Sequence, residues 1–284
     1  MDIMQIRIDD ADYPAHLRAI KDPPKKLYYI GDLKLIRDPG IAVVGTRRSS
    51  PYGRWAAKEI AKRIARCRVP VISGMAEGID SAAHWGCLSE DMGTVAVFGT
   101  GVDICFPTSN ARLRQKIETG GLILSEYEPG TIGFRGNFPE RNRIISGLSK
   151  SVIVVEGALK SGSMITARLA LEQGRDVFAV PGNIDQPNSI GVNKLIADGA
   201  FPIMQLDGIE ELLGIGRGRI ARMIESFSDE EKIVIGSILE APGISAEEIA
   251  LRSGLSLREC SLLASALELK GFIRSEGSRL FVIK

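Results

Sequence analysis

Short apolar runs alternate with helical patterns along most of this chain, and the alternation constrains the fold more than any other feature. The runs have the length and apolar continuity of buried strands, and most of them end at or beside a glycine. The predicted strands are 41–46, 70–74, 94–101, 121–126, 151–157, 176–182 and 200–204. The segments between them predict helices at 53–67, 78–90, 111–120, 165–174 and 192–199. This order predicts an α/β fold, a Rossmann-like, doubly wound and mostly parallel sheet covered by helices on both faces.

The alternation also predicts the domain organisation. Residues 1–39 are a polar lead-in that we expect to pack along the sheet edge, and residues 40–213 form the Rossmann-like domain. A glycine-rich linker is predicted at 214–227. Residues 228–284 predict a small winged-helix domain of three helices and a closing hairpin.

The winged-helix prediction depends on helix-start signals. Ser228 precedes three acidic residues, as an N-cap does, and Ser245 with Glu248 has the spacing of a capping box. A third helix is predicted at 256–271, followed by a hairpin that turns at 276–278. From residue 229 to the end, seven Lys/Arg stand against nine Asp/Glu. A recognition helix in a DNA groove is usually basic, so a partner-binding or regulatory role is favoured for this domain.

Composition excludes several classes of protein. The Met-Asp start lacks the basic and apolar regions of a signal peptide, and no apolar run approaches the roughly 20 residues that span a bilayer. We therefore predict a cytoplasmic protein without membrane contact. Because the net charge is only +1, nucleic-acid binding must come from local patches.

One local patch surrounds the predicted strand 151–157. A small-residue loop with one cation, KSGS at 160–163, follows that strand and precedes a helix. From 134 to 168, six Lys/Arg stand against two Glu. A strand, a glycine loop and a helix start present backbone N–H groups to phosphate. The predicted phosphate-binding residues here are Phe138, Arg141, Asn142, Arg143, Lys160, Ser161, Gly162, Ser163 and Thr166.

Three more glycine loops are predicted at the same sheet edge. The first, 45–53, carries two arginines and suits an anion at a helix start, although a tight turn with solvated arginines explains it equally well. For Phe138, packing in the core is the alternative to stacking on an unpaired base. For Asn142, a local turn is the alternative to a base contact. The DNA- or phosphate-binding residues predicted in these loops are Gly45, Arg47, Arg48, Ser49, Gly53, Ser73, Gly74, Gly78, Gly99 and Gly101.

Catalytic and cofactor signals are scarce. No Walker A loop and no G-x-G-x-x-G fingerprint occurs, which argues against bound nucleoside triphosphates, NAD and FAD. Neither of the two histidines, His16 and His84, stands in a metal-ligand or nucleophile pattern. We therefore predict no catalytic residue, no metal and no cofactor, and a protein that is not an enzyme.

Five segments together resemble the DNA-processing protein A family (DprA, also called Smf), in the order and spacing of that family. The resemblance runs from about residue 12 to the end of the chain. The segments are VVGTRRSSPYG (43–53), SGMAEGIDSAAH (73–84), FPERNRIISGLS (138–149), VVEGALKSGSMITARLALEQGRDVFAVPG (154–182) and GVNKLIADGA (191–200).

The resemblance implies a Rossmann-like domain that binds and protects single-stranded DNA, loads RecA recombinase during natural transformation, and forms homodimers. It carries family DNA contacts over to Arg47, Arg141, Arg143, Lys160, Ser161, Gly162 and Ser163. Two features depart from the family. Glu77 stands where an arginine is usual, and an N-terminal sterile-alpha-motif-like domain is not expected before the first strand.

Two other functions fit the sequence less well. A nucleotide-processing enzyme of the phosphoribohydrolase type would use P-G-G-x-G-T, whereas the corresponding segment, 181–189, reads PGNIDQPNS. A transcription regulator with a ligand-sensing domain would need a basic recognition helix, which the acidic C-terminal domain does not offer. Single-stranded DNA binding is therefore the preferred prediction.

Overall fold

A computed structural model describes residues 2–215, 227–270 and 272–282. The chain divides into two compact units after Ile215. Most of the predicted linker, 214–227, lies outside the described residues. Within the described residues, no helix is long and apolar enough to cross a bilayer.

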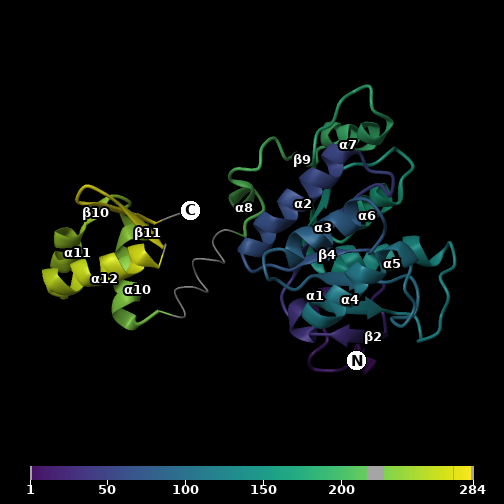
Figure 1. Cartoon of the computed structure of the whole chain (residues 1–284), viewed down its shortest axis with the longest axis horizontal. Helices are drawn as coiled ribbons and strands as arrows, with labels where there is room; N and C mark the ends of the chain where they lie inside the picture. Colours follow the sequence, from purple (N-terminus) through teal and green to yellow (C-terminus); the bar gives the residue numbers. More distant parts are fainter. Residues whose placement is uncertain (1, 216–226, 271, 283–284) are drawn as a thin grey trace. The chain divides into compact units, whose positions relative to one another are not determined.

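The first unit is built on a nine-stranded, mostly parallel sheet in the order β1-β2-β6-β5-β4-β3-β7-β8-β9 (Figure 1). All seven predicted strands are present, and β3 to β9 run parallel to one another. The strands are β1 Met4–Arg7, β2 Lys26–Gly31, β3 Gly40–Val44, β4 Val71–Ser73, β5 Val95–Val97, β6 Leu122–Ser125, β7 Ser149–Val154, β8 Asp176–Ala179 and β9 Phe201–Pro202. The predicted fold class is confirmed.

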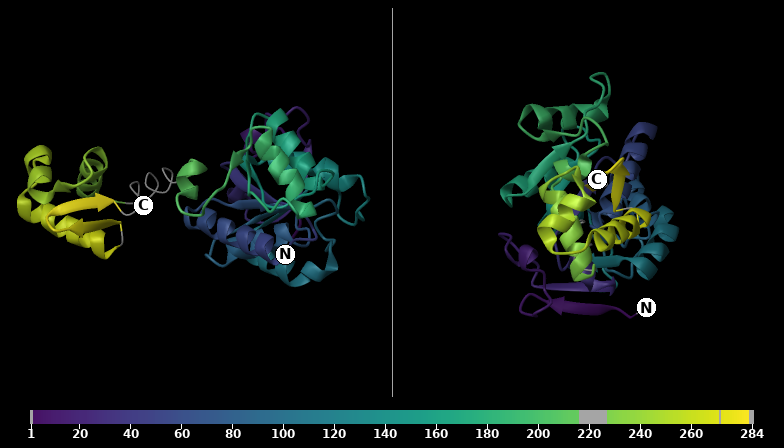
Figure 2. Two further views of the ribbon diagram at one scale, coloured as in Figure 1. Left: turned by 90° about the horizontal axis from the view of Figure 1, so that it is seen from above. Right: turned by 90° about the vertical axis from the view of Figure 1, so that its left-hand side faces the viewer.

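Helices cover both faces of this sheet (Figures 1 and 2). They are α1 Ala15–Arg18, α2 Pro51–Arg66, α3 Ile79–Leu88, α4 Ala111–Gly120, α5 Asn137–Gly147, α6 Gly162–Glu172, α7 Pro187–Ala197 and α8 Ile209–Leu212, with 3-10 turns at Leu33–Ile36 and Thr108–Asn110. Successive strand residues alternate between the two faces, so Ile41 and Val43 pack with α2, whereas Ala42 and Val44 pack with α5 and α6. Both faces are therefore buried, as the continuous apolar strands predicted.

The lead-in contributes two strands that were not predicted. β1 pairs antiparallel with β2, and β2 pairs antiparallel with β6 at the sheet edge. Three side chains of the lead-in are buried in the core that α5 and α6 share with the sheet: Tyr13, Leu17 and Leu27. The lead-in is thus part of the Rossmann-like unit and shares its core.

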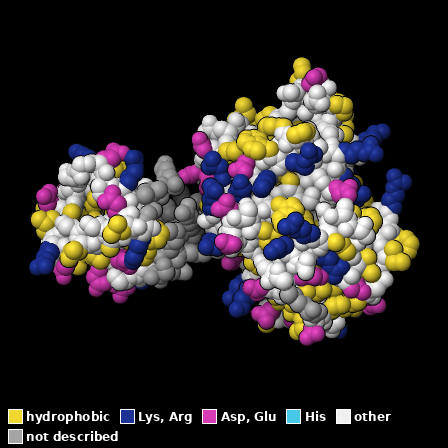
Figure 3. Space-filling model, in the orientation of Figure 1, with side chains coloured by type: hydrophobic (Ala, Val, Ile, Leu, Met, Phe, Trp, Pro, Cys, Tyr) yellow, Lys and Arg dark blue, Asp and Glu magenta, His cyan; other side chains and the backbone are white. Residues whose placement is uncertain are grey.

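The second unit has the helices and three-stranded sheet of a winged helix. Its elements are α10 Asp229–Glu240, β10 Ile244–Ser245, α11 Ala246–Ser253, α12 Leu257–Leu269, β11 Ile273–Glu276 and β12 Arg279–Val282. Capping boxes start all three helices, at Ser228, Ser245 and Ser256. The β11–β12 hairpin turns through Gly277, whose φ of 66° is a conformation that glycine adopts readily. Figure 3 shows acidic and basic side chains interspersed on the visible face of this unit.

Candidate nucleic-acid interface

The order of the strands places a switch point between β3 and β7. The chain proceeds from β3 through β4 and β5 to β6 on one side, and then crosses to β7, β8 and β9 on the other. Ligands of open α/β sheets bind outside the carboxyl ends of the strands at such a point. Thr46, just after β3, donates its N–H to the carbonyl of Glu156, just after β7, at 2.7 Å. The two predicted phosphate loops are therefore in contact at this edge.

The start of α6 is open to an external anion. Ser161 is its N-cap residue, but no side chain of the cap accepts a hydrogen bond from the first turn. Its hydroxyl instead lies 2.7 Å from the hydroxyl of Ser163. Lys160 and Gly162 are exposed beside this helix start. Unpaired N–H groups, the positive end of the helix dipole and one ammonium together suit a phosphate.

The start of α2 differs, because the protein supplies its own anion there. The buried Glu156 carboxylate accepts the N–H of Ser50 at 2.9 Å and also the Ser50 hydroxyl. Ser50 in turn accepts the N–H of Gly53 at 2.9 Å. A methyl group at Gly53 would overlap the carboxylate, which explains the glycine. For this loop the sequence left open an external anion or a tight turn with solvated arginines, and in the structure Glu156 occupies the helix start.

The exposed Arg47 and the half-buried Phe138 form a cation–aromatic pair next to the switch point. The Arg47 guanidinium lies over the Phe138 ring, 5.4 Å from its centroid. The Phe138 ring also contacts Phe106, with ring centroids 5.3 Å apart, and Phe106 is 46% exposed. Gly99 lies against the Phe138 ring, where a Cβ would come within 2.9 Å. Phe106 was not predicted, although its place in the third glycine loop beside Pro107 was a signal for it.

Arg141 is buried and holds two loops of this edge together. Its side chain donates to the carbonyls of Gly74, at 2.9 Å, and Val97. Asp80 accepts the N–H of Gly74 at 3.1 Å, so the guanidinium and the carboxylate meet at the same glycine. Burial lowers the pKa of Arg141 to about 10, and burial raises the pKa of Asp80 although Arg141 opposes the rise. The resemblance implied a DNA contact for Arg141, but the residue is only 5% exposed.

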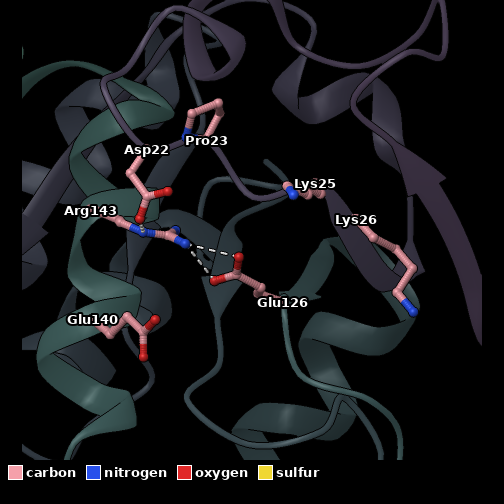
Figure 4. A pocket seen from close by; sticks show the side chains of 7 residues that line it. All are labelled: Asp22, Pro23, Lys25, Lys26, Glu126, Glu140 and Arg143. Atoms are coloured by element: carbon pink, nitrogen blue, oxygen red, sulfur yellow. Dashed lines mark hydrogen bonds and ion pairs between the residues drawn. The ribbon is translucent and has the colours of Figure 1, made fainter.

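The two residues that follow Arg141, Asn142 and Arg143, make contacts in two different parts of the unit. Asn142 is buried and donates to the carbonyl of Gly162 at 3.3 Å, which joins α5 to the start of α6. Arg143 donates to both carboxylate oxygens of Glu126, at 2.8 and 2.7 Å, and to Asp22 at 3.2 Å. Arg143, Glu126 and Asp22 line a pocket of about 370 Å³ together with two lysines of the lead-in (Figure 4). Arg143 is thus paired with acidic side chains and is not brought to the α6 start.

The remaining predicted residues divide into exposed and supporting positions. Arg48 is exposed, and its carbonyl accepts an amide N–H of Asn188 at 2.8 Å. The hydroxyls of Ser73 and Thr166 are used internally, on the carbonyls of Val43 and Gly162. Ser49 accepts the Arg54 guanidinium on its carbonyl at 2.7 Å, and the close-fitting loop backbone leaves no room for a Cβ at Gly45, Gly78 and Gly101.

Glu77, the departure from the family pattern, lies at the rim of this edge. It is exposed and accepts the Ser109 hydroxyl at 2.6 Å. The carboxylate is therefore held toward the loop after β5. Within the described residues, no group of three or more His, Cys, Asp or Glu side chains is arranged to hold a metal.

His84 lies buried under the loops and gives a pH-dependent prediction. Its Nδ1 lies 2.8 Å from the Thr94 hydroxyl, which itself donates to the carbonyl of Val71, so Nδ1 is the protonated nitrogen. Burial, and then Arg141, lower the pKa of His84 to about 3. Between the ordinary pKa of about 6.5 and that value, the unfolded chain binds a proton that the folded chain excludes. Stability therefore falls as the pH falls, by up to about 1.4 kcal/mol per pH unit.

Urea unfolding measured between about pH 7.5 and pH 5 checks the predicted loss of stability at lower pH. His84→Gln should flatten the dependence. Burial also lowers the pKa of His16, to about 4, so His16→Gln should remove part of what remains. A dependence unchanged in His84→Gln would contradict the assignment.

Known proteins share this architecture and these motifs. The family model of DNA recombination-mediator protein A matches residues 4–214. DNA processing protein DprA of Streptococcus pneumoniae is 44% identical over 193 residues, which are 68% of this chain and 68% of that protein. Protein Smf of Synechocystis is 44% identical over 211 residues, 72% of this chain. The match covers 53% of the Synechocystis protein, so the chain spans about half of that relative.

Solved structures agree with these sequence comparisons. The X-ray structure of DNA processing protein A from S. pneumoniae superposes with a TM-score of 0.71 at 40% identity, over 74% of each chain. The same protein from Helicobacter pylori, described for a unique single-stranded DNA binding mode, superposes with a TM-score of 0.69 at 34% identity, over 75% of this chain and 95% of that one. With one family model covering the whole Rossmann-like unit, and relatives that share both fold and motifs, this chain belongs to the DNA recombination-mediator protein A family, whose members are named DprA or Smf.

Proposed function

We propose that this chain binds single-stranded DNA along the carboxyl edge of its Rossmann-like sheet, protects it and delivers it to RecA recombinase during natural transformation or recombination. The observation that carries the proposal is the open start of α6, with Lys160 exposed beside it, next to the Arg47–Phe138 pair. The α6 start with Lys160 binds a phosphate, and the Arg47–Phe138 pair suits an unpaired base. A duplex keeps its bases stacked inside, so the aromatic rings favour a single strand.

The residues of the edge take different roles in this proposal. Arg47, Arg48, Lys160 and the N–H groups of Gly162 and Ser163 contact the phosphates, and Phe138 with Phe106 contacts bases. Arg141 and Asn142 support the loops from below, because their side chains are buried on backbone carbonyls. In this proposal the protein acts by binding DNA and catalyses no reaction. The buried carboxylate of Glu156 is hydrogen-bonded to Ser50, which leaves it engaged at the start of α2.

RecA and a second copy of the chain are the proposed protein partners. Family resemblance supports both. The edge strand β9 offers a surface for a second copy, with Phe201 51% exposed and Met204, just beyond it, 77% exposed. Sedimentation at several protein concentrations, with and without RecA, checks these two partners.

The proposal is tested by titrating a labelled single-stranded oligonucleotide and the matching duplex at two salt concentrations. We expect the single strand to bind more tightly, with an affinity that falls steeply as salt rises. Lys160→Ala should weaken binding about tenfold, since a charge-assisted contact to phosphate is lost. The loss should be similar for different sequences, because phosphates carry no base identity.

Lys116→Ala is the matched control, because Lys116 is an exposed lysine on α4. It should bind like the parent. Equal affinity for duplex and single strand, or a Lys160→Ala variant that binds like Lys116→Ala, would contradict the proposed site. Release of free base from nucleoside monophosphates, followed by chromatography, would instead support the nucleotide-processing alternative.

A further inference from the structure

Two aromatic side chains lie exposed on the first two turns of α2, where no described element covers them. Tyr52 is 52% exposed and Trp55 is 53% exposed. Their ring centroids are 5.9 Å apart, with the planes tilted by 34°. Single exposed apolar side chains are ordinary on protein surfaces, but two large aromatic rings side by side are a less common feature. The tilt keeps the rings from closing face to face on each other, so faces stay available to a flat ligand.

These rings are held close to the Arg47 loop. Ser50 and Glu156 lock the first turn of α2, as described above. Arg54 donates to the carbonyl of Ser49 at 2.7 Å, so its guanidinium also lies against the loop. The backbone that carries Tyr52 is therefore rigid. A rigid aromatic surface loses little conformational freedom when it binds a ligand.

The surroundings of the two rings are basic. Residues 47–58 contain four Lys/Arg and no Asp or Glu, and Glu59, one turn after Trp55, is half-buried and paired with Lys62 at 2.7 Å. At the helix start itself, the carboxylate of Glu156 is 7% exposed and hydrogen-bonded to Ser50. Over the region of α2, the face shown in Figure 3 carries Lys and Arg side chains beside hydrophobic ones, with some Asp and Glu side chains among them. A polyanion with flat apolar groups fits this combination better than an uncharged apolar partner does.

We propose that Tyr52 and Trp55 form a second base-stacking site, which extends the DNA path from the α6 start across the sheet edge to α2. This inference rests on the proposed function. α6 and α2 lie on opposite faces of the sheet, and both helices begin at its carboxyl edge. A strand held at the α6 start and at Arg47 passes over the edge and reaches α2. Short oligonucleotides fill the first site alone, and longer ones reach both.

Tryptophan fluorescence tests the contact directly. The chain has two tryptophans, so Trp85→Phe leaves Trp55 as the only one. Oligothymidylates of increasing length are titrated into this full-length variant, with binding measured in parallel by anisotropy of a labelled end. We expect short oligonucleotides to bind without quenching Trp55, and longer ones to quench it at saturation. Binding of all lengths without quenching would overturn the second site and leave the proposed function intact, whereas no binding at any length would refute the proposed function.

Affinity measurements give an independent test. Trp55→Ala should weaken the binding of longer oligonucleotides about tenfold and leave the binding of short ones unchanged. Trp55→Phe should retain most of the affinity for longer oligonucleotides because it keeps an aromatic ring. Equal affinities for Trp55→Ala and the parent at every length would overturn the proposal. So would a shift in Trp55 emission that follows protein concentration without DNA, since it would mean that a second copy of the chain covers these rings.

Discussion

Replacing Arg141 with alanine is expected to destabilise the Rossmann-like unit by about 3 kcal/mol or more. Two buried carbonyls, of Gly74 and Val97, lose the donor that satisfies them. Asp80 also loses the buried positive charge that opposes the rise of its pKa. Urea unfolding followed by circular dichroism measures the loss. Arg141→Lys should be intermediate, because one ammonium keeps the charge but lacks the planar fork that reaches both loops.

The loss of unfolding free energy in Arg141→Ala, relative to the parent, should become smaller as the pH falls from about 8 to about 5. Without Arg141, the pKa of the buried Asp80 rises further above its unfolded value. The stability that Asp80 contributes is present at low pH and is lost as the pH rises through that raised pKa. Arg141 also lowers the pKa of His84, so its removal reduces the acid sensitivity that His84 causes.

Arg135→Ala is the matched control, since this exposed arginine stands in the loop before α5. It should change stability by no more than about 0.5 kcal/mol. If Arg141→Ala unfolds at the same urea concentration as Arg135→Ala, Arg141 does not support the loops, and a direct role on the surface would have to be reconsidered.

The contrast between Arg141 and Lys160 shows what residue patterns can predict about this site. Both residues are cations within the charged segment that the sequence analysis identified. Strand periodicity predicted the sheet and hence the carboxyl edge at which both residues lie. It did not predict α5, whose turns direct Arg141 and Asn142 inward and give Arg143 acidic partners. Whether a cation near a glycine loop faces DNA or the protein depends on tertiary neighbours that lie far apart in sequence.

Glu156 shows the same limit from the opposite direction. The sequence places it just after a predicted strand, at the sheet edge, but gives no partner for it. The structure places it against the start of α2, 106 residues away in sequence from Ser50. Only the pairing of β3 with β7 brings the two together, and that pairing is a property of the topology. Capping signals within one segment, such as those at Ser228 and Ser245, were by contrast found from spacing alone.

Glu156→Ala is expected to lower stability by about 2–4 kcal/mol, because the N-terminal end of α2 loses a buried, charge-assisted acceptor for Ser50. The removal also empties a position that suits an anion, at the positive end of a helix of 16 residues. Sulfate should therefore raise the melting temperature of Glu156→Ala more than that of the parent, compared with chloride at equal ionic strength. Glu156→Gln should lose less stability and respond less to sulfate, because the amide still fills the space.

Glu172→Ala is the matched control for this prediction. Glu172 is an exposed glutamate that pairs with Arg168 on the surface of α6, so its loss should cost no more than about 0.5 kcal/mol. A Glu156→Ala variant that is as stable as Glu172→Ala, or that responds to sulfate only as the parent does, would show that α2 does not depend on this carboxylate. A specific sulfate response would instead support the proposal that DNA phosphate binds at the start of α6 and not at the start of α2. Of the two helix starts at the switch point, α2 already contains its anion, and α6 is the one left open for an external phosphate.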